Sequence, residues 1–121
     1  MNTENSHLIL IADDEADIRA LLRILLEKDG HRVLEAPDGI KALEALRDHS
    51  DVSLILLDIM MPELDGFSAC RQIRKFSDIP IIMLSARGEE YDKINGFSLG
   101  IDDYVVKPFS PKELMSLMPL S

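Results

Sequence analysis

The residues of this chain that could do chemistry are aspartates placed where aliphatic runs end. Asp58 directly follows the run LILL, and a second run, LILIA, ends in the adjacent pair Asp13 and Asp14. A carboxylate at the end of a buried strand loses its hydration, which is unfavourable unless another group pairs with it. We therefore expect Asp58 to have a partner, and its position indicates a chemical role.

Two further polar residues end aliphatic runs in the same way. Ser85 follows IIML and Lys107 follows YVV. Three clustered carboxylates repel one another unless a cation neutralises them, and oxygen ligands without Cys or His suit Mg²⁺. Lys107 could then hold a phosphoryl oxygen and Ser85 could donate a hydroxyl. Together these groups predict phosphoryl transfer to a carboxylate nucleophile, Asp58.

The elements that must position these residues alternate along the chain. Aliphatic runs predict strands at 7–14, 31–36, 52–59, 79–86 and 103–108, and amphipathic stretches predict helices at 15–30, 38–49, 65–76, 89–100 and from 110 onward. Gly30 is expected to end the first helix, and Ser110 to cap the last one in the sequence SPKE. The pattern predicts one doubly wound (βα)5 domain over residues 1–121, a three-layer α/β sandwich with a parallel sheet.

In doubly wound sheets, sites form at the carboxyl ends of the strands, beside the point where the strand order reverses. If the order is 2-1-3-4-5, the first and third strands are neighbours. Asp13, Asp14 and Asp58 then meet in one crevice.

Composition excludes several classes of function. The chain has 121 residues, 46% of them hydrophobic, and its net charge of −9 argues against nucleic-acid binding. No apolar run approaches the ~20 residues that cross a membrane. Cys70 is the single cysteine, so no internal disulfide can form, and we expect a cytoplasmic protein.

The stretches LILIADDE, LILLDIMMPELDG, IIMLSA and DDYVVKPF resemble the signature blocks of two-component response regulator receiver domains. The likeness runs from about residue 7 to residue 114, and MMPELDG together with the stretch from Ser85 to Leu114 is most similar to the OmpR/PhoB type. It implies a CheY-like (flavodoxin-like) fold of order 2-1-3-4-5. It also implies a signalling domain rather than an enzyme, one that catalyses only its own phosphoryl transfer and slow dephosphorylation. We expect no output domain in this chain and a shortened last helix, because Pro119 breaks it.

The resemblance also implies roles for individual residues. Asp58 would accept the phosphoryl group from a sensor histidine kinase. Asp14 would bind Mg²⁺ directly and Asp13 through a water molecule, with Asp58 and the backbone carbonyl of Met60 completing the ligands. Lys107 would bridge to the phosphoryl group.

The resemblance implies that further residues change the conformation of the domain on phosphorylation or set the lifetime of the phosphorylated state. Ser85 would move to hydrogen-bond the phosphate, and Tyr104 would turn inward as Ser85 leaves space. A cis bond between Lys107 and Pro108 is implied as well. Met60 and Arg87 would flank the hydrolytic water without positioning it, so we expect a long-lived phosphorylated state.

Phosphorylation is expected to reshape the surface formed by the helix at 89–100, the strand at 103–108 and the last helix. Gly96 and Gly100 weaken the first of these helices. No Lys or Arg follows Lys112, so charges that could pair across a two-fold axis are missing. We therefore expect a mainly monomeric chain, with at most weak self-association through this surface.

Other interpretations remain open. Taken singly, Asp14 could be an ordinary helix cap, as is expected of Asp65, and Cys70 is expected to lie in the core. His7, His31 and His49 are expected to face solvent. A nucleotide-binding flavodoxin-like protein would need a glycine-rich loop where this chain has ADDEADI, and a haloacid-dehalogenase-type phosphatase would need DxD. A stand-alone receiver or a pseudo-receiver that only binds proteins is the main alternative.

Overall fold

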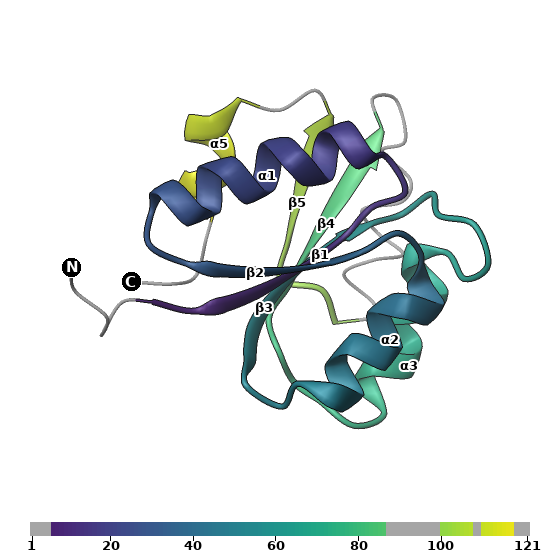
Figure 1. Ribbon diagram of the computed structural model, residues 1–121. Helices are drawn as coiled ribbons and strands as arrows, with labels where there is room; N and C mark the ends of the chain where they lie inside the picture. The colour runs from purple at the N-terminus through teal and green to yellow at the C-terminus, as the bar shows by residue number, and fades with distance from the viewer. Residues whose placement is uncertain (1–5, 87–99, 108–109, 118–121) are drawn as a thin grey trace.

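A five-stranded parallel sheet forms the centre of the molecule, with helices on both faces (Figure 1). The computed structural model describes residues 6–86, 100–107 and 110–117. The elements are β1 (Leu8–Ala12), α1 (Ala16–Lys28), β2 (Arg32–Ala36), α2 (Gly39–Asp48), β3 (Val52–Asp58), α3 (Gly66–Arg74), β4 (Ile81–Ala86), β5 (Asp103–Lys107) and α5 (Pro111–Leu117). The strand order is β2-β1-β3-β4-β5, so the predicted fold class and order are confirmed.

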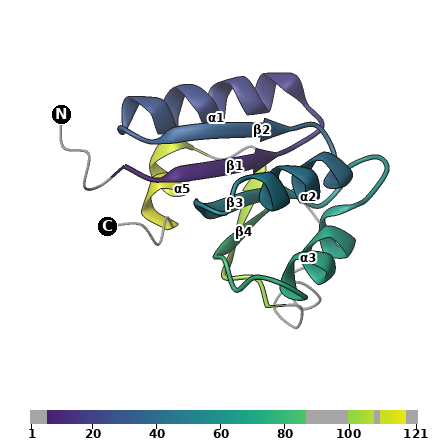
Figure 2. The ribbon, with the colours of Figure 1, turned by 60° about the horizontal axis from the view of Figure 1, so that its bottom comes forward.

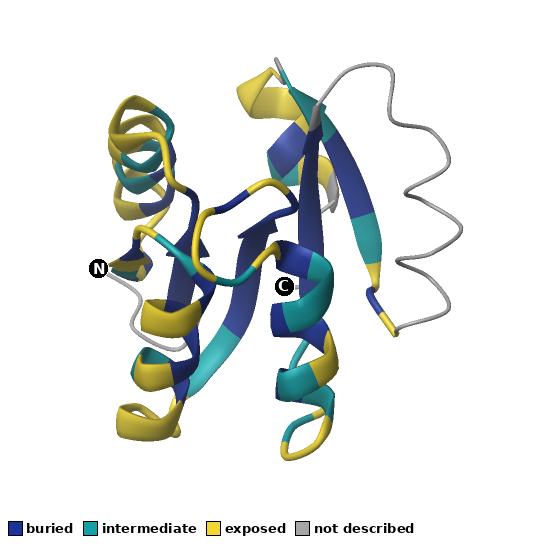
Figure 3. Ribbon diagram, turned by 90° about the vertical axis from the view of Figure 1, so that its right-hand side faces the viewer, coloured by how far each residue is buried: buried dark blue, intermediate teal, exposed yellow. Residues whose placement is uncertain are grey.

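The helices form two separate layers. α1 and α5 cover one face of the sheet, and α2 and α3 cover the other (Figure 2). Every residue of β1 is buried because both faces of this strand are covered: Ile9 and Ile11 pack with Leu22 and Leu26 of α1, while Leu10 packs in the opposite layer. Figure 3 shows the result, with buried strands at the centre and the exposed helix residues turned outward.

Helix ends agree with the local signals in the sequence. The Asp65 carboxylate accepts a hydrogen bond from the Ser68 amide at 2.9 Å, and the Ser110 hydroxyl accepts one from the Glu113 amide at 3.0 Å, so both predicted caps are confirmed. Gly30 follows the end of α1 with φ of 91°, a conformation that favours glycine. Asp14 does not cap α1, because the N-cap residue is Glu15 and it lacks a side-chain cap.

Cys70 is fully buried, as predicted, but the prediction for His31 was wrong. His31 is only 9% exposed. Its Nδ1 atom accepts a hydrogen bond from the His7 amide at 3.2 Å, and its ring centroid lies 5.5 Å from that of His7. His31 precedes β2 and His7 precedes β1, so the parallel pairing of these strands brings the two rings together.

Several predictions fall on residues that the structure leaves undescribed. They concern the helix expected at 89–100, including Gly96, together with Arg87, Pro108 and Pro119. Among the described residues, none of the helices has both the length and the apolar character that a membrane span requires.

Candidate functional site

Three aspartates meet at the carboxyl edge of the sheet. Asp58 is the last residue of β3, and Ala12 of β1 is in register with Leu57 of β3. Asp13, which follows Ala12, therefore lies beside Asp58, which follows Leu57. Asp13 is fully buried and Asp58 is 5% exposed, while Asp14 is exposed. One oxygen from each of the three carboxylates lies within 4.8 Å of the others. The structure therefore forms the crevice that the strand order predicts.

Lys107 reaches into this crevice from the end of β5. Its Nζ atom lies 2.7 Å from Oδ2 of Asp13 and 3.4 Å from Oδ1 of Asp58. It also lies 3.2 Å from Oε2 of Glu15. Since β4 separates β5 from β3, the long lysine side chain must extend past the end of β4. Glu15 was not predicted as a partner, although its place directly after the acidic pair was a usable signal.

The surroundings shift the pKa values of Asp58 and Lys107. Burial raises the pKa of Asp58 to about 7; the charge of Asp13 acts in the same direction, and Lys107 opposes it. Burial by itself would lower the pKa of Lys107, but the short contact with Asp13 and the charge of Asp58 raise it overall. Lys107 therefore remains a cation, and the carboxylate of Asp58 is held in its ionised form only at a cost in free energy.

The donor set fits a hard divalent cation. Three carboxylates against one ammonium group leave two negative charges when all are ionised. Oδ2 of Asp13 is buried and, among the described residues, accepts no hydrogen bond of good angle, even though Nζ of Lys107 is close. An all-oxygen set of this charge suits Mg²⁺. Asp13, Asp14 and Asp58, with the carbonyl of Met60, are the residues that would hold it.

The site opens to solvent through a shallow depression of about 290 Å³. Asp14, Glu15, Asp58, Met60 and Lys107 line it. The Met60 side chain is 63% exposed at this opening, directly beyond the end of β3. A phosphoryl donor could therefore approach Asp58 from solvent, past an apolar side chain.

The loop after Asp58 is held by a close backbone contact. The Gly66 amide donates to the carbonyl of Ile59 at 2.8 Å, and the Ile59 amide donates to the carbonyl of Leu84 at 3.1 Å. A Cβ atom on Gly66 would collide with the carbonyl oxygen of Asp58. Glycine at the start of α3 thus allows the loop to pack directly on the backbone of Asp58.

Ser85 and Tyr104 lie on the same face of the sheet. Tyr104 is in register with Met83, and Ser85 is two residues further along β4. Both residues are buried, at 2% and 7% exposed, and Tyr104 packs in the core layer of α2 and α3. The shared face is what a coupled movement of the two side chains needs, and that movement stays a prediction.

Comparison with known proteins gives a consistent picture. A family model described as response regulator receiver domain matches residues 9–118. The transcriptional regulatory protein ResD of Bacillus subtilis strain 168 is 50% identical over 115 residues, which are 95% of this chain and 48% of ResD. The transcriptional regulatory protein SrrA of Staphylococcus aureus strain NCTC 8325 is 46% identical over 110 residues, 91% of this chain and 45% of SrrA. The chain thus spans about half the length of these curated relatives.

Solved structures match the fold closely. The crystal structure of the receiver domain of NtrX from Brucella abortus is 32% identical with a TM-score of 0.85, and the match covers 90% of this chain and 92% of that one. A response regulator receiver domain protein from Clostridium thermocellum is 28% identical with a TM-score of 0.86, covering 92% of this chain and 90% of that one. In each of these comparisons the match covers at least 90% of this chain and of the solved chain.

Proposed function

The chain belongs to the response regulator receiver family, and we propose that it is phosphorylated on Asp58 by a sensor histidine kinase. One observation carries this proposal: Asp58 is buried at the carboxyl edge of the sheet, within 3.4 Å of Lys107 and beside two further carboxylates. A structural ion pair with Lys107 would not need two further carboxylates beside Asp58. A carboxylate nucleophile with a metal site beside it does.

The side chains divide the work of phosphoryl transfer. An oxygen of the Asp58 carboxylate forms the new bond to phosphorus, while the bond between phosphorus and the histidine nitrogen of the kinase breaks. The ammonium group of Lys107 holds an oxygen of the transferred group, and the Ser85 hydroxyl donates to another. Mg²⁺, when bound, neutralises charge on the phosphoryl oxygens. The covalent change then biases Ser85 and Tyr104 towards a second arrangement, which alters the surface near β5 and α5.

We propose transcription control as the output of this switch. ResD and SrrA both carry the name transcriptional regulatory protein, and both are about twice as long as the segment that matches this chain. A cytoplasmic location agrees with a kinase and a transcriptional output.

The proposal is tested by treating the chain with acetyl phosphate and measuring its intact mass. We expect one phosphoryl adduct in the presence of Mg²⁺ and none in EDTA, with acetyl phosphate consumed no faster than the slow loss of that adduct. Rapid turnover without a stable adduct would favour an aspartate-dependent phosphatase. A folded chain that takes up no phosphoryl group would favour a pseudo-receiver that acts by binding alone.

Metal binding is expected to depend more on Asp14 than on Asp13. Oδ1 of Asp13 already accepts a hydrogen bond from the Glu15 amide at 2.8 Å, and its Oδ2 lies beside Lys107. Asp14 is exposed to the incoming ion. In isothermal titration calorimetry, Asp14→Ala should raise the Kd for Mg²⁺ by roughly tenfold or more, and Asp13→Ala by less. Asp17→Ala, which removes an exposed aspartate from the first turn of α1, should leave the Kd unchanged. Equal losses for Asp13 and Asp14 would contradict the assignment.

The lifetime of the phosphorylated state is expected to depend on Met60. Its exposed thioether lies at the mouth of the site and cannot hold a hydrolytic water by a strong hydrogen bond. Replacing Met60 by Asn, alone and together with Arg87→Glu, should shorten the lifetime several-fold in a phosphate-release assay. Met60→Leu is the matched control, since it keeps an apolar side chain. Equal decay in Met60→Asn and Met60→Leu would count against this role.

A further inference from the structure

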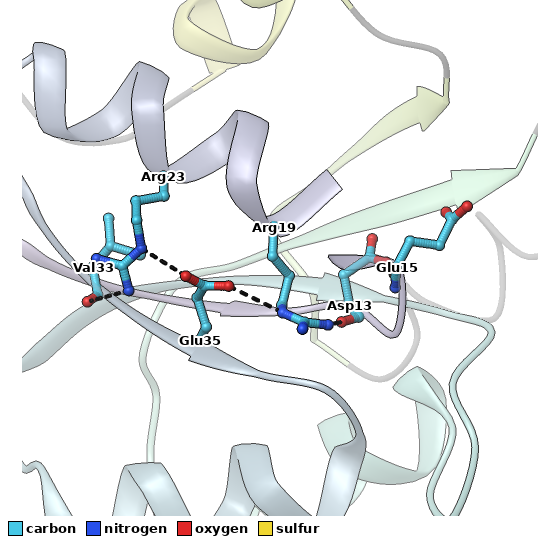
Figure 4. A network of polar contacts seen from close by, with 6 residues as sticks. All are labelled: Asp13, Glu15, Arg19, Arg23, Val33 and Glu35. Atoms are coloured by element: carbon cyan, nitrogen blue, oxygen red, sulfur yellow. Dashed lines mark hydrogen bonds and ion pairs between the residues drawn. The ribbon is translucent and has the colours of Figure 1, made fainter. Parts of the chain in front are cut away.

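Arg19 of α1 connects the acidic turn to the neighbouring strand. Its Nη1 atom donates to the backbone carbonyl of Asp13 at 2.7 Å, and its Nε atom donates to Oε1 of Glu35 on β2 at 3.0 Å (Figure 4). The side chain is 18% exposed, so this bridge is largely shielded from solvent. The planar guanidinium group can make both bonds at once, which a lysine cannot do in the same geometry.

The carbonyl that Arg19 binds belongs to the peptide between the two acidic residues. A planar peptide ties the direction of the Asp13 carbonyl to the position of the Asp14 Cα atom. On the other side of Asp13, its amide donates to the carbonyl of Ala36 at 3.1 Å. Asp13 is thus held from both of its peptide groups just beyond β1, and the bond from Arg19 also fixes the position of the Asp14 Cα atom.

Glu35 is a fixed anchor for Arg19. Its second carboxylate oxygen accepts a hydrogen bond from Nε of Arg23 at 2.6 Å, and Arg23 also bonds Glu27 at 3.0 Å. The bond with Arg23, aided by Arg19, lowers the pKa of Glu35, so this carboxylate stays ionised. Arg23 lies one helical turn further along α1 and also binds Glu35. Among the described residues its other hydrogen bonds go to Glu27 and to the carbonyl of Val33, not to Asp13.

We propose that Arg19 is a positioning residue for the metal site: by holding the Asp13–Asp14 peptide, it sets the affinity of the site for Mg²⁺ without being a ligand. This inference rests on the proposed Mg²⁺-dependent function. The direction of the change in Mg²⁺ affinity separates a positioning role of Arg19 from a simple effect of its charge. Removing a cation near an acidic site should strengthen Mg²⁺ binding through the field, whereas loss of positioning should weaken it.

The experiment compares Arg19→Gln with Arg23→Gln in the full chain. Both substitutions remove one positive charge from α1 and one bond to Glu35, but the first alone frees the Asp13 carbonyl. We expect the Kd for Mg²⁺, measured by isothermal titration calorimetry, to rise roughly tenfold in R19Q and to change less than about twofold in R23Q. Arg19→Lys should fall between wild type and R19Q. At saturating Mg²⁺, the rate of labelling by acetyl phosphate in R19Q should return close to that of the wild type.

Thermal unfolding in EDTA shows whether each variant is folded at the temperature of titration. Unchanged or tighter Mg²⁺ binding in R19Q would overturn the inference. Equal weakening in R19Q and R23Q would overturn it too, because the effect would then come from the shared ion-pair network. A wild-type chain without Mg²⁺ affinity would overturn the proposed function as well, whereas wild-type binding with unchanged R19Q affinity overturns this inference alone.

Discussion

Asp58→Asn is expected to take up no phosphoryl group from acetyl phosphate and, in metal-free buffer, to be more stable than the wild-type chain. The first effect follows because an amide cannot replace the carboxylate nucleophile. The second follows because Asp58 is 5% exposed and lies beside Asp13, so its ionised form is unfavourable in the folded state. We expect the free energy of unfolding to rise by about 2 kcal/mol at pH 8, less than the full pKa shift implies because the amide of Asn only approximates the protonated carboxyl group.

The raised pKa of Asp58 also predicts how the stability difference between Asp58→Asn and the wild-type chain changes with pH. The pKa of Asp58 is about 7 in the folded chain and ~3.9 in an unfolded one, so the folded state binds the proton more tightly. The stabilisation from that proton is complete below pH ~3.9 and is lost as the pH rises through about 7. The advantage of Asp58→Asn over wild type should therefore shrink by about 1 kcal/mol between pH 8 and pH 6.

Urea unfolding in EDTA at the two pH values measures both effects. Asp17→Asn is the matched control, because Asp17 is exposed in α1 and its substitution should leave stability and labelling almost unchanged. A phosphoryl adduct that persists in Asp58→Asn would refute the assigned acceptor. A variant less stable than wild type at pH 8 would show that the Lys107 ion pair outweighs the desolvation of Asp58.

Gly66→Ala is expected to destabilise the fold and to impair phosphorylation together. The added Cβ would lie 2.8 Å from Cα of Ile59 and still closer to the carbonyl oxygen of Asp58, and these are backbone atoms that cannot rotate away. The Gly66 amide is also bonded to the Ile59 carbonyl, so a shift of α3 would break that bond. We expect a loss of about 3 kcal/mol in the free energy of unfolding and slower labelling by acetyl phosphate.

Gly30→Ala provides the comparison for this substitution. In the part of the chain that the structure describes, no atom outside the adjacent residues lies within 4 Å of a Cβ added at Gly30, so only its φ of 91° is unfavourable for alanine. That strain should cost about 1 kcal/mol and leave the labelling rate unchanged. If Gly66→Ala labels at the wild-type rate with wild-type stability, the close contact does not position Asp58.

Across the described residues, the sequence by itself determined the helices and strands and the residues that cap or end several of them. Continuous aliphatic runs become strands when both sheet faces are covered, and helical spacing of Leu and Ile produces the covering helices. Asp65, Ser110 and Gly30 act on backbone groups within a few residues, so their roles could be predicted locally. The grouping of Asp13, Asp14 and Asp58 also followed, since parallel strands end at one edge and the strand order decides which ends are neighbours.

Tertiary structure alone decided which side chains touch. Lys107 lies closer to Asp13 than to Asp58, and it also reaches Glu15, 92 residues away in sequence. Arg19 could have faced solvent like other charged residues on α1, yet the packing of that helix against β2 places its guanidinium group between Glu35 and the Asp13 carbonyl. These contacts depend on strand register, helix rotation and side-chain rotamers acting together. No local pattern carries that information, because each contact joins segments that only the folded chain brings together.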